Sequence, residues 1–403
     1  MKILASTLTT LALLATCGPA LAAEDTPADK FEGKLEPFLG EPKFDMQRIF
    51  GKDPFRGRFP NIVTAVDGTV LAFWEPLNVR RSEDGGKTWG IEIPIVKKGG
   101  KGGGVTVNET NGEIFAFGGK ATVHRSQDNG KTWSPVKAEI KPDINGNVPT
   151  MHMAEHGITL RHGAHAGRMI RPARVYKDPQ YNTAIYSDDG GKTWLSSGPF
   201  PIMGTGEGAV AELCDGRIYY SSRNHKFEKE ADFRYQRSFA WSYDGGETWR
   251  DAGYHKELPD GPRYRGKNGR GLNFNGHFGM MGGLTRLPVA KRDVLIYSNA
   301  DTPDHNRVRM TVWASFDGGK SWPVKRLVFE GGSAYSSLNA GRPGTPSEGW
   351  IYLLFESGEG KESGEGKDYG GRIARFNMGW LLQGEKTGDG EVPSWIAERK
   401  AEH

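Results

Sequence analysis

The sequence predicts an all-β fold, a six-bladed β-propeller. An eight-residue pattern, Ser-x-Asp-x-Gly-x-Thr/Ser-Trp, recurs five times, and each copy lies between short runs of alternating apolar and polar residues. The copies are residues 82–89, 126–133, 187–194, 242–249 and 315–322. The chain also contains 57 glycines and 11 tryptophans, residues suited to many tight turns packed onto sheets. A repeat of this kind indicates blades or coils built from one unit, and short strands with regular turns favour a closed β-fold.

Each repeat is expected to form the tip of a β-hairpin. In the first copy, Ser82 and Asp84 can hydrogen-bond the backbone of a tight turn, Gly86 can adopt a positive φ, and Trp89 can pack on the sheet. We therefore assign the repeats a structural role and give their aspartates no part in catalysis.

Five repeats predict five blades. We expect the sixth blade to use the late runs 351–355 and 372–376, closed by a strand from the N-terminal region, because such closure removes exposed sheet edges. The expected organisation is a signal segment at 1–22, an extension at 23–44, the propeller at 45–385 and a tail at 386–403.

The first residues predict an exported protein. Lys2 precedes an apolar run that is too short to span a bilayer, and Ala20-Leu-Ala22 resembles a cleavage site. We expect a periplasmic or secreted protein, with lipid attachment at Cys17 as an alternative. Removal of the segment would leave Cys214 without a disulfide partner in the chain.

The charge pattern indicates which kinds of partner the chain can bind. The net charge is +4, and basic and acidic residues alternate along the whole chain, which argues against a nucleic-acid surface. There is no second long apolar run, so no membrane span is expected. We expect a monomer.

Several residues outside the repeats resemble a known active site. Arg58 begins an Arg-Phe-Pro segment before the first repeat, and Glu207 and Arg223 follow the third. Arg307 leads into the fifth repeat, and Tyr335 follows it. These segments, with Glu356 at the end of a late strand and repeats of the Asp-box type, are similar in order and spacing to the sialidase (neuraminidase) superfamily.

The resemblance implies a role for each of these residues. Arg58, Arg223 and Arg307 would bind the carboxylate of an acidic sugar, and Glu356 would steady the first arginine. Three guanidiniums give charge-assisted, fork-shaped hydrogen bonds to a carboxylate. Tyr335 would be the nucleophile, activated by Glu207, because a neutral phenol is not repelled by the substrate's own charge. The product would then retain its anomeric configuration.

One departure from the family concerns the proton donor. The sialidase loop that carries an aspartic acid/base is missing, since residues 71–81 run almost directly into the first repeat. Glu75, Glu155 and His156 could supply the proton, and Asp53 is a weaker candidate. We expect Glu75 in a catalytic role and Glu155 and His156 in substrate binding, although each could equally be a hydrogen-bonded loop residue.

No metal or cofactor is expected. His152, His156, His162 and His165 are close in sequence, but glycines interrupt the segment and no acidic or cysteine pattern completes a site.

Two functions follow from these residues. The first is an exo-acting glycoside hydrolase that releases terminal sialic acid, or a related acidic sugar, from a glycan or glycoconjugate. The alternative is a glycan-binding or assembly propeller that keeps the arginines but has lost turnover together with the loop. Tyr335 and Glu207 favour the enzyme, because binding alone needs neither.

Overall fold

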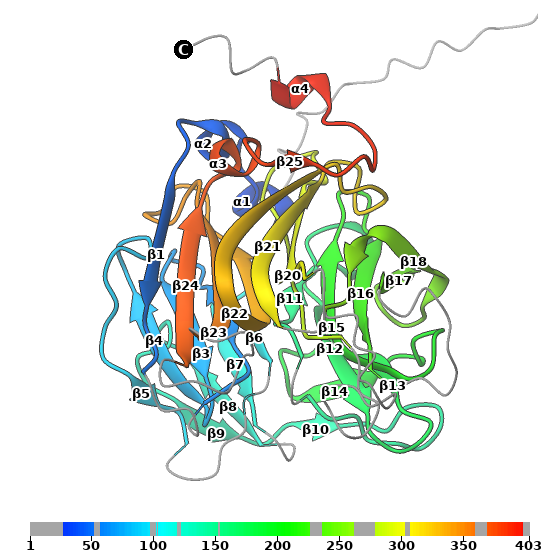
Figure 1. Cartoon of the computed structure of the whole chain (residues 1–403). Coiled ribbons are helices and arrows are strands. Elements are labelled where there is room, and N and C mark those ends of the chain that lie inside the picture. Colours follow the sequence, from blue (N-terminus) through cyan, green and yellow to red (C-terminus); the bar gives the residue numbers. More distant parts are fainter. Residues whose placement is uncertain are drawn as a thin grey trace, which may run out of the picture.

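The computed structural model describes residues 27–51, 57–96, 102, 104–118, 122–151, 154–225, 236–261, 279–302, 307–358 and 369–397. Almost all regular structure in these ranges is β-strand, and the sheets are arranged around a common axis (Figure 1). The all-β propeller prediction is therefore confirmed. The predicted signal segment lies outside the described residues.

The first three blades are consecutive antiparallel sheets. The first consists of β2 (Asn61–Thr64), β3 (Val70–Trp74), β4 (Asn78–Ser82) and β5 (Ile93–Pro94). The second consists of β6 (Val105–Val107), β7 (Ile114–Phe117), β8 (Val123–Ser126) and β9 (Ser134–Val136). The third consists of β11 (Ile158–Thr159), β12 (Met169–Val175), β13 (Tyr181–Ser187) and β14 (Thr193–Ser196), with β10 (Glu139–Ile140) pairing in parallel with β14.

The fourth blade consists of β15 (Thr205–Glu212), β16 (Ile218–Asn224), β17 (Gln236–Ser242) and β18 (Arg250–Pro259). The remaining strands form one eight-stranded sheet. Its members are β19 (Gly283–Arg286), β20 (Leu295–Ala300), β21 (Val308–Ser315), β22 (Val324–Ala340), β23 (Ile351–Gly358), β24 (Gly370–Phe376), β1 (Phe44–Arg48) and β25 (Glu385–Lys386).

The large sheet divides into two blades along β22. The first part of β22 pairs with β21, and the part after residue 332 pairs with β23, with a register shift between Ser333 and Ser336. The innermost strands contact one another in the order β2, β6, β11, β15, β19, β22 and again β2. The described strands thus form a closed ring of six blades.

The last blade is completed by the N-terminal strand. β1 pairs antiparallel with β24 over Phe44–Arg48 and lies beside it in Figure 1, although the two are far apart in sequence. The sequence-based assignment of the sixth blade to residues 351–355, 372–376 and an N-terminal strand agrees with this pairing.

The repeats form the expected hairpin tips. In the third repeat, the Ser187 hydroxyl donates to Asp189 (2.9 Å) and accepts from the Gly191 N–H (2.9 Å), and the Trp194 indole donates to the Gly191 carbonyl (3.1 Å). All five repeats lie between the third and fourth strands of a blade. Because neighbouring strands are antiparallel, the tips lie at the end of the ring where the innermost strands finish.

Short helices lie outside the sheets. They are α1 (Pro27–Phe31), α2 (Glu36–Leu39), the 3₁₀ helix η1 (Gly163–His165), α3 (Met378–Leu381) and α4 (Ser394–Ala397). Phe31, Leu35 and Phe38 are buried, and the Glu32 carboxylate accepts from His162 (2.9 Å). The described part of the predicted extension is thus packed onto the propeller. None of the described helices has the length and apolar character needed to cross a bilayer.

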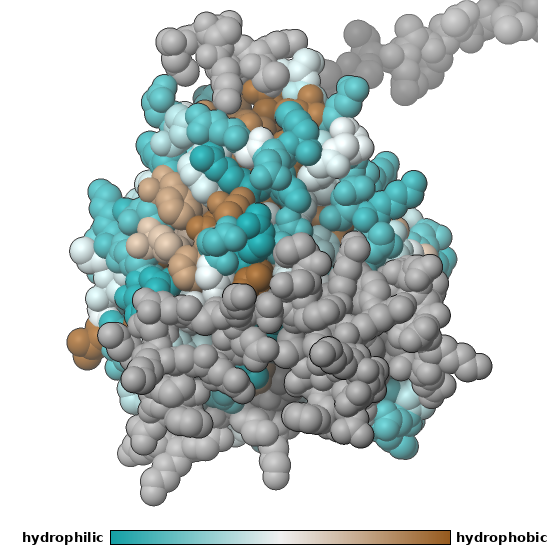
Figure 2. Space-filling model, in the orientation of Figure 1, coloured by the Kyte–Doolittle hydropathy of each residue, from teal (hydrophilic) through white to brown (hydrophobic). Residues whose placement is uncertain are grey.

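The core is divided between neighbouring blades, as expected for a propeller. One apolar cluster joins the first two blades through residues such as Val63, Phe73 and Val105, and another joins the fourth and fifth through Tyr219, Tyr297 and Trp322. On the face shown in Figure 2, hydrophilic residues surround small apolar areas, in keeping with the mixed charge of the sequence.

Candidate active site

The site lies where the innermost strands begin, at the opposite end of the ring from the hairpin tips. Arg58 stands just before β2, and its guanidinium donates two hydrogen bonds to Glu356 of β23, from Nε (3.2 Å) and Nη2 (3.1 Å). The Phe59 N–H donates to the same carboxylate (3.0 Å). Glu356 is fully buried, whereas 41% of the Arg58 side chain is exposed, so a ligand can reach the guanidinium. The Glu356 charge raises the pKa of Arg58 well above its usual value.

The backbone before Arg58 accepts only glycine without strain. Gly57 has a φ of +103°, and a β-carbon there would come within 2.1 Å of the Trp74 indole nitrogen. The Arg58 carbonyl then accepts from the Glu75 N–H (3.0 Å), which ties the segment to the end of β3. The glycine conformation and this backbone hydrogen bond therefore fix the position of Arg58.

A second group joins Glu207, Arg223 and Tyr335. Arg223 Nη1 donates to Glu207 Oε2 (2.5 Å) and to the Tyr335 hydroxyl (2.8 Å), and that hydroxyl lies 3.1 Å from Glu207 Oε1. The three residues are 1%, 1% and 5% exposed. Glu207 and Arg223 come from β15 and β16 of the fourth blade, and Tyr335 comes from the part of β22 that begins the sixth blade. A carboxylate, a guanidinium and a phenol thus share hydrogen bonds in a site shielded from water.

Arg307, just before β21, completes a ring of cations around the phenol. The central guanidinium carbons of Arg58, Arg223 and Arg307 lie 5.0, 5.8 and 5.5 Å from the centre of the Tyr335 ring. Arg307 Nη2 donates to the Gly279 carbonyl (3.3 Å). Loss of contact with water lowers the pKa of Arg307; Tyr335 opposes this effect, and the charges of Arg223 and Arg58 add to it. Three guanidiniums face only two carboxylates, Glu207 and Glu356, so the excess positive charge favours an anionic ligand.

Glu207 is held by a second arginine that the sequence analysis did not identify. Arg174 of β12 donates from Nη1 to Glu207 Oε1 (3.1 Å), and both side chains are 1% exposed. Burial alone would raise the pKa of Glu207, but the guanidiniums of Arg223 and Arg174 outweigh it and hold that pKa well below its usual range. Glu207 is consequently ionised.

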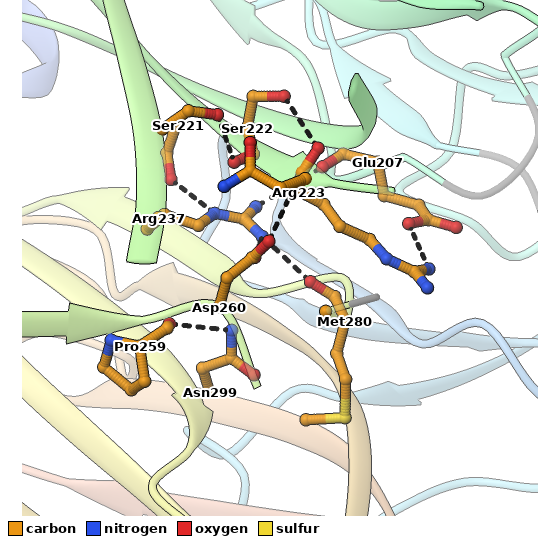
Figure 3. A network of polar contacts seen from close by, with 12 residues as sticks. Glu207, Ser221, Ser222, Arg223, Arg237, Pro259, Asp260, Met280 and Asn299 are labelled. Atoms are coloured by element: carbon orange, nitrogen blue, oxygen red, sulfur yellow. Dashed lines mark hydrogen bonds and ion pairs between the residues drawn. The ribbon is translucent and has the colours of Figure 1, made fainter. Parts of the chain in front are cut away.

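A buried ion pair supports the site from behind (Figure 3). Arg237 donates to Ser221 Oγ (2.9 Å), to Asp260 (2.8 Å) and to the Met280 carbonyl (2.8 Å). Asp260 also accepts from the N–H of Asn224, the residue after Arg223 (2.6 Å). Burial, opposed by Arg237, raises the pKa of Asp260 to about 7. This pair fixes the backbone next to Arg223 and was also missed from the sequence.

Comparisons with known proteins identify the family of the chain. The family model of the BNR repeat-like domain matches residues 76–346. A sialidase of Micromonospora viridifaciens is 30% identical over 418 residues, covering 90% of this chain and 59% of that protein. The chain belongs to the sialidase superfamily. A sialidase of Vibrio cholerae is 25% identical over 222 residues, covering 48% of this chain and 26% of that protein, so the chain spans less than two thirds of either relative.

Solved structures show that the family fold is shared at low sequence identity. The intramolecular trans-sialidase of Ruminococcus gnavus, in complex with oseltamivir carboxylate, has a TM-score of 0.61 at 15% identity, covering 83% of this chain and 98% of that one. The Trypanosoma rangeli sialidase has a TM-score of 0.57 at 18% identity, covering 85% and 61%. A Dyadobacter fermentans protein of unknown function has a TM-score of 0.58 at 16% identity, covering 84% and 100%.

The candidate replacements for the family's acid/base residue lie in different places. Glu75 follows β3 directly, and its backbone is bonded to Arg58 at the edge of the site. Only Pro76 and Leu77 separate it from β4, so β3 and β4 are joined by a tight turn. Asp53 and His152 lie outside the described residues.

Glu155 and His156 lie deeper, among the innermost strands, and His156 lines the pocket between those strands, the central channel. Glu155 is fully buried, and one carboxylate oxygen accepts from the Leu338 N–H (2.8 Å), three residues beyond Tyr335. Burial raises the pKa of Glu155 to about 8 and lowers the pKa of His156. The His156 ring lies 2.8 Å from the Leu338 carbonyl and 3.0 Å from the Gly157 carbonyl. These contacts with the channel wall favour a structural role over the expected substrate binding.

Two further histidines of the cluster considered as metal ligands lie elsewhere. His162 forms an ion pair with Glu32, and His165 is the last residue of the helix η1. Across the ranges that the structure describes, no three histidine, cysteine or acidic side chains gather as metal ligands would.

Proposed function

We propose that this chain is an exo-acting glycoside hydrolase that releases terminal sialic acid, or a related acidic sugar, from glycans or glycoconjugates. The observation that carries the proposal is the arrangement of three guanidiniums around the Tyr335 phenol, with Glu207 within hydrogen-bonding distance of its hydroxyl. The relatives named as sialidases support the same reading.

Substrate binding would use the uncompensated positive charge. The Arg58 side chain is partly exposed and held by Glu356, Arg307 is half-buried, and Arg223 is buried. A sugar carboxylate entering this place would accept hydrogen bonds from all three arginines and relieve their mutual repulsion. A neutral sugar offers no such gain, so selectivity for an acidic sugar follows from the same charges.

The chemical step would form a covalent bond between the sugar and Tyr335. The Tyr335 oxygen attacks the anomeric carbon, its proton passes to Glu207, and the bond from that carbon to the leaving oxygen breaks. The three nearby cations stabilise negative charge on the phenol oxygen. Water then cleaves the glycosyl–tyrosine bond, Tyr335 regains its proton, and the sugar leaves with retained configuration.

The leaving oxygen needs a proton, and we assign its donation to Glu75. Glu75 follows the strand next to Arg58 at the edge of the site, where a leaving group would be. Glu155 and His156 are buried, so they are less suited to donate a proton to it. General acid catalysis matters most for poor leaving groups. Glu75→Gln should therefore slow release from a sialyl-lactose at least about 100-fold, while release of an activated phenol falls by less than about tenfold. Equal loss on both substrates would remove Glu75 from this role.

The central test measures release of a fluorogenic phenol from an α-sialoside by the full chain. Tyr335→Phe and Arg223→Ala should each abolish release, whereas Arg250→Ala, at an exposed arginine of β18, should leave it unchanged. A fluorinated sialosyl donor that forms the covalent bond quickly and loses it slowly should add its mass to a peptide containing Tyr335. A mass increase at another residue would contradict the proposed nucleophile.

The short turn between β3 and β4 supports the alternative, a propeller that binds acidic glycans without cleaving them. Calorimetric binding of a sialoside by wild type, lost in Arg223→Ala and accompanied by no release, would establish that function. We also propose that the protein acts as a monomer in the periplasm or outside the cell, after removal of residues 1–22. Mass determination of the exported protein and light scattering test these two statements.

A further inference from the structure

We propose that Arg174 is a positioning residue, which holds the Glu207 carboxylate in place while Arg223 turns to bind the substrate. The inference rests on the proposed hydrolase function. It concerns an arginine outside the set that resembles the family's carboxylate-binding triad.

Glu207 is a buried carboxylate that needs cationic partners. Glu207 is 1% exposed, so its charge has little contact with water and must be compensated by hydrogen bonds. Oε1 lies 3.1 Å from both Arg174 Nη1 and the Tyr335 hydroxyl, and Oε2 accepts from Arg223 Nη1 at 2.5 Å. Two arginines therefore share one carboxylate.

Arg223 cannot serve Glu207 and a substrate equally. Its Nη1 already donates to both Glu207 and the Tyr335 hydroxyl. A fork-shaped bond to a sugar carboxylate through Nη1 and Nη2 competes with these two bonds, unlike the Nε–Nη2 fork that Arg58 forms with Glu356. In our proposal the substrate binds through Nη1 and Nη2 of Arg223, so Glu207 loses part of its interaction with Arg223 and Arg174 becomes its main cationic partner.

Arg174 is fixed well enough to fill that role. Its Nη2 lies 2.8 Å from His225 Nδ1, and its guanidinium lies 4.0 Å from the centre of the Tyr176 ring. Gln180 also donates to His225 Nδ1 (2.7 Å). Because arginine has no acceptor, Nδ1 must accept, so His225 is neutral with its proton on Nε2.

The arrangement also links basicity to substrate binding. With both arginines attached, the pKa of Glu207 is held well below its usual range, and the carboxylate is a weak base. Transfer of Arg223 to the substrate removes one of the two cations that keep it so. Glu207 would thus become a stronger base at the stage when the Tyr335 proton must leave, while Arg174 keeps its oxygen directed at the phenol.

The first experiment compares Arg174→Gln, Arg223→Gln and the exposed control Arg250→Gln on a sialoside. Arg174→Gln should lower kcat about 10- to 100-fold with KM changed less than about threefold, and the acidic limb of the kcat–pH profile should move to higher pH. Arg223→Gln should raise KM. A higher KM with unchanged kcat in Arg174→Gln would mean that Arg174 binds the substrate, and an unchanged pH profile would mean a merely structural role; either overturns the proposal.

A second measurement needs no turnover and separates this inference from the proposed function. A double-mutant cycle of Arg174→Gln and Glu207→Gln, followed by urea unfolding, should give a coupling of at least about tenfold in the unfolding equilibrium constant. Additive effects of the two substitutions would overturn the role of Arg174. If wild type releases no acidic sugar, the proposed function fails, and the cycle alone decides whether Arg174 holds Glu207.

Discussion

Replacing Glu155 by glutamine should change how the stability of the protein depends on pH. Glu155 is fully buried among the innermost strands, and burial raises its pKa from 4.5 to about 8. The folded state therefore keeps a proton on this residue up to about pH 8, while the unfolded chain releases it near its ordinary pKa. Because the folded state binds the additional proton, the wild-type protein loses stability as the pH rises through this interval.

The size of the effect follows from the two pKa values. Between pH 5 and pH 8 the contribution of this one group to the free energy of unfolding falls by about 3–4 kcal/mol. Glutamine keeps an oxygen for the Leu338 N–H, which Glu155 now bonds at 2.8 Å, and it carries no proton to release. The free energy of unfolding of the variant will therefore differ from that of wild type in two ways. One is a constant that reflects the contacts of the amide, and the other is this pH-dependent contribution of Glu155.

Urea unfolding followed by tryptophan fluorescence at pH 5, 6, 7 and 8 measures the difference. The free energy of unfolding of Glu155→Gln minus that of wild type should increase steadily across this range, because other titrating groups cancel in the subtraction. Glu139→Gln, at an exposed position, should show a flat difference. A flat difference for Glu155→Gln as well would refute the argument that this carboxyl is buried and protonated.

Two further substitutions test the start of the site and the attachment of the N-terminal segment. Gly57→Ala should lower the free energy of unfolding by about 2 kcal/mol or more, because of the positive φ and the close Trp74 ring. It should also raise KM, because the β-carbon displaces the following arginine. The control Gly40→Ala, which has open space at its β-carbon, should leave the free energy of unfolding nearly unchanged. Glu32→Gln should lower the free energy of unfolding by about 2–3 kcal/mol at pH 6, since burial raises the pKa of Glu32 but its ionic partners lower it to about 2. That loss should disappear as the pH falls from 4.5 toward 2, and should shrink again at high pH as His162, whose pKa Glu32 raises, loses its proton. A pH-independent loss would contradict the ion pair.

Most of the ring could be predicted because its signals are local. Each hairpin tip is specified by residues within eight positions, with serine and aspartate bonding the turn and tryptophan packing on it. The approach of Tyr335 to the three predicted arginines could also be anticipated, since their order along the chain resembles that of the family.

The missed residues depend on contacts that a single sequence does not reveal. Arg174 and Arg237 are arginines within strands, and their burial becomes clear only when distant carboxylates, Glu207 and Asp260, lie beside them. The available signal for Arg174 was the presence of two arginines, Arg171 and Arg174, in a strand whose other residues are apolar. The full burial of Glu155 could not be predicted either, because nothing in its loop indicates that the surrounding strands enclose it.

The pairing of β1 with β24 sets the order in which the molecule can be completed. The strand made first must wait, unpaired, until more than 320 further residues have been synthesised, since it pairs with residues up to Phe376. Ring closure is thus a late step, and an N-terminal truncation that reaches Phe44–Arg48 would leave the final blade open to the edge of another molecule.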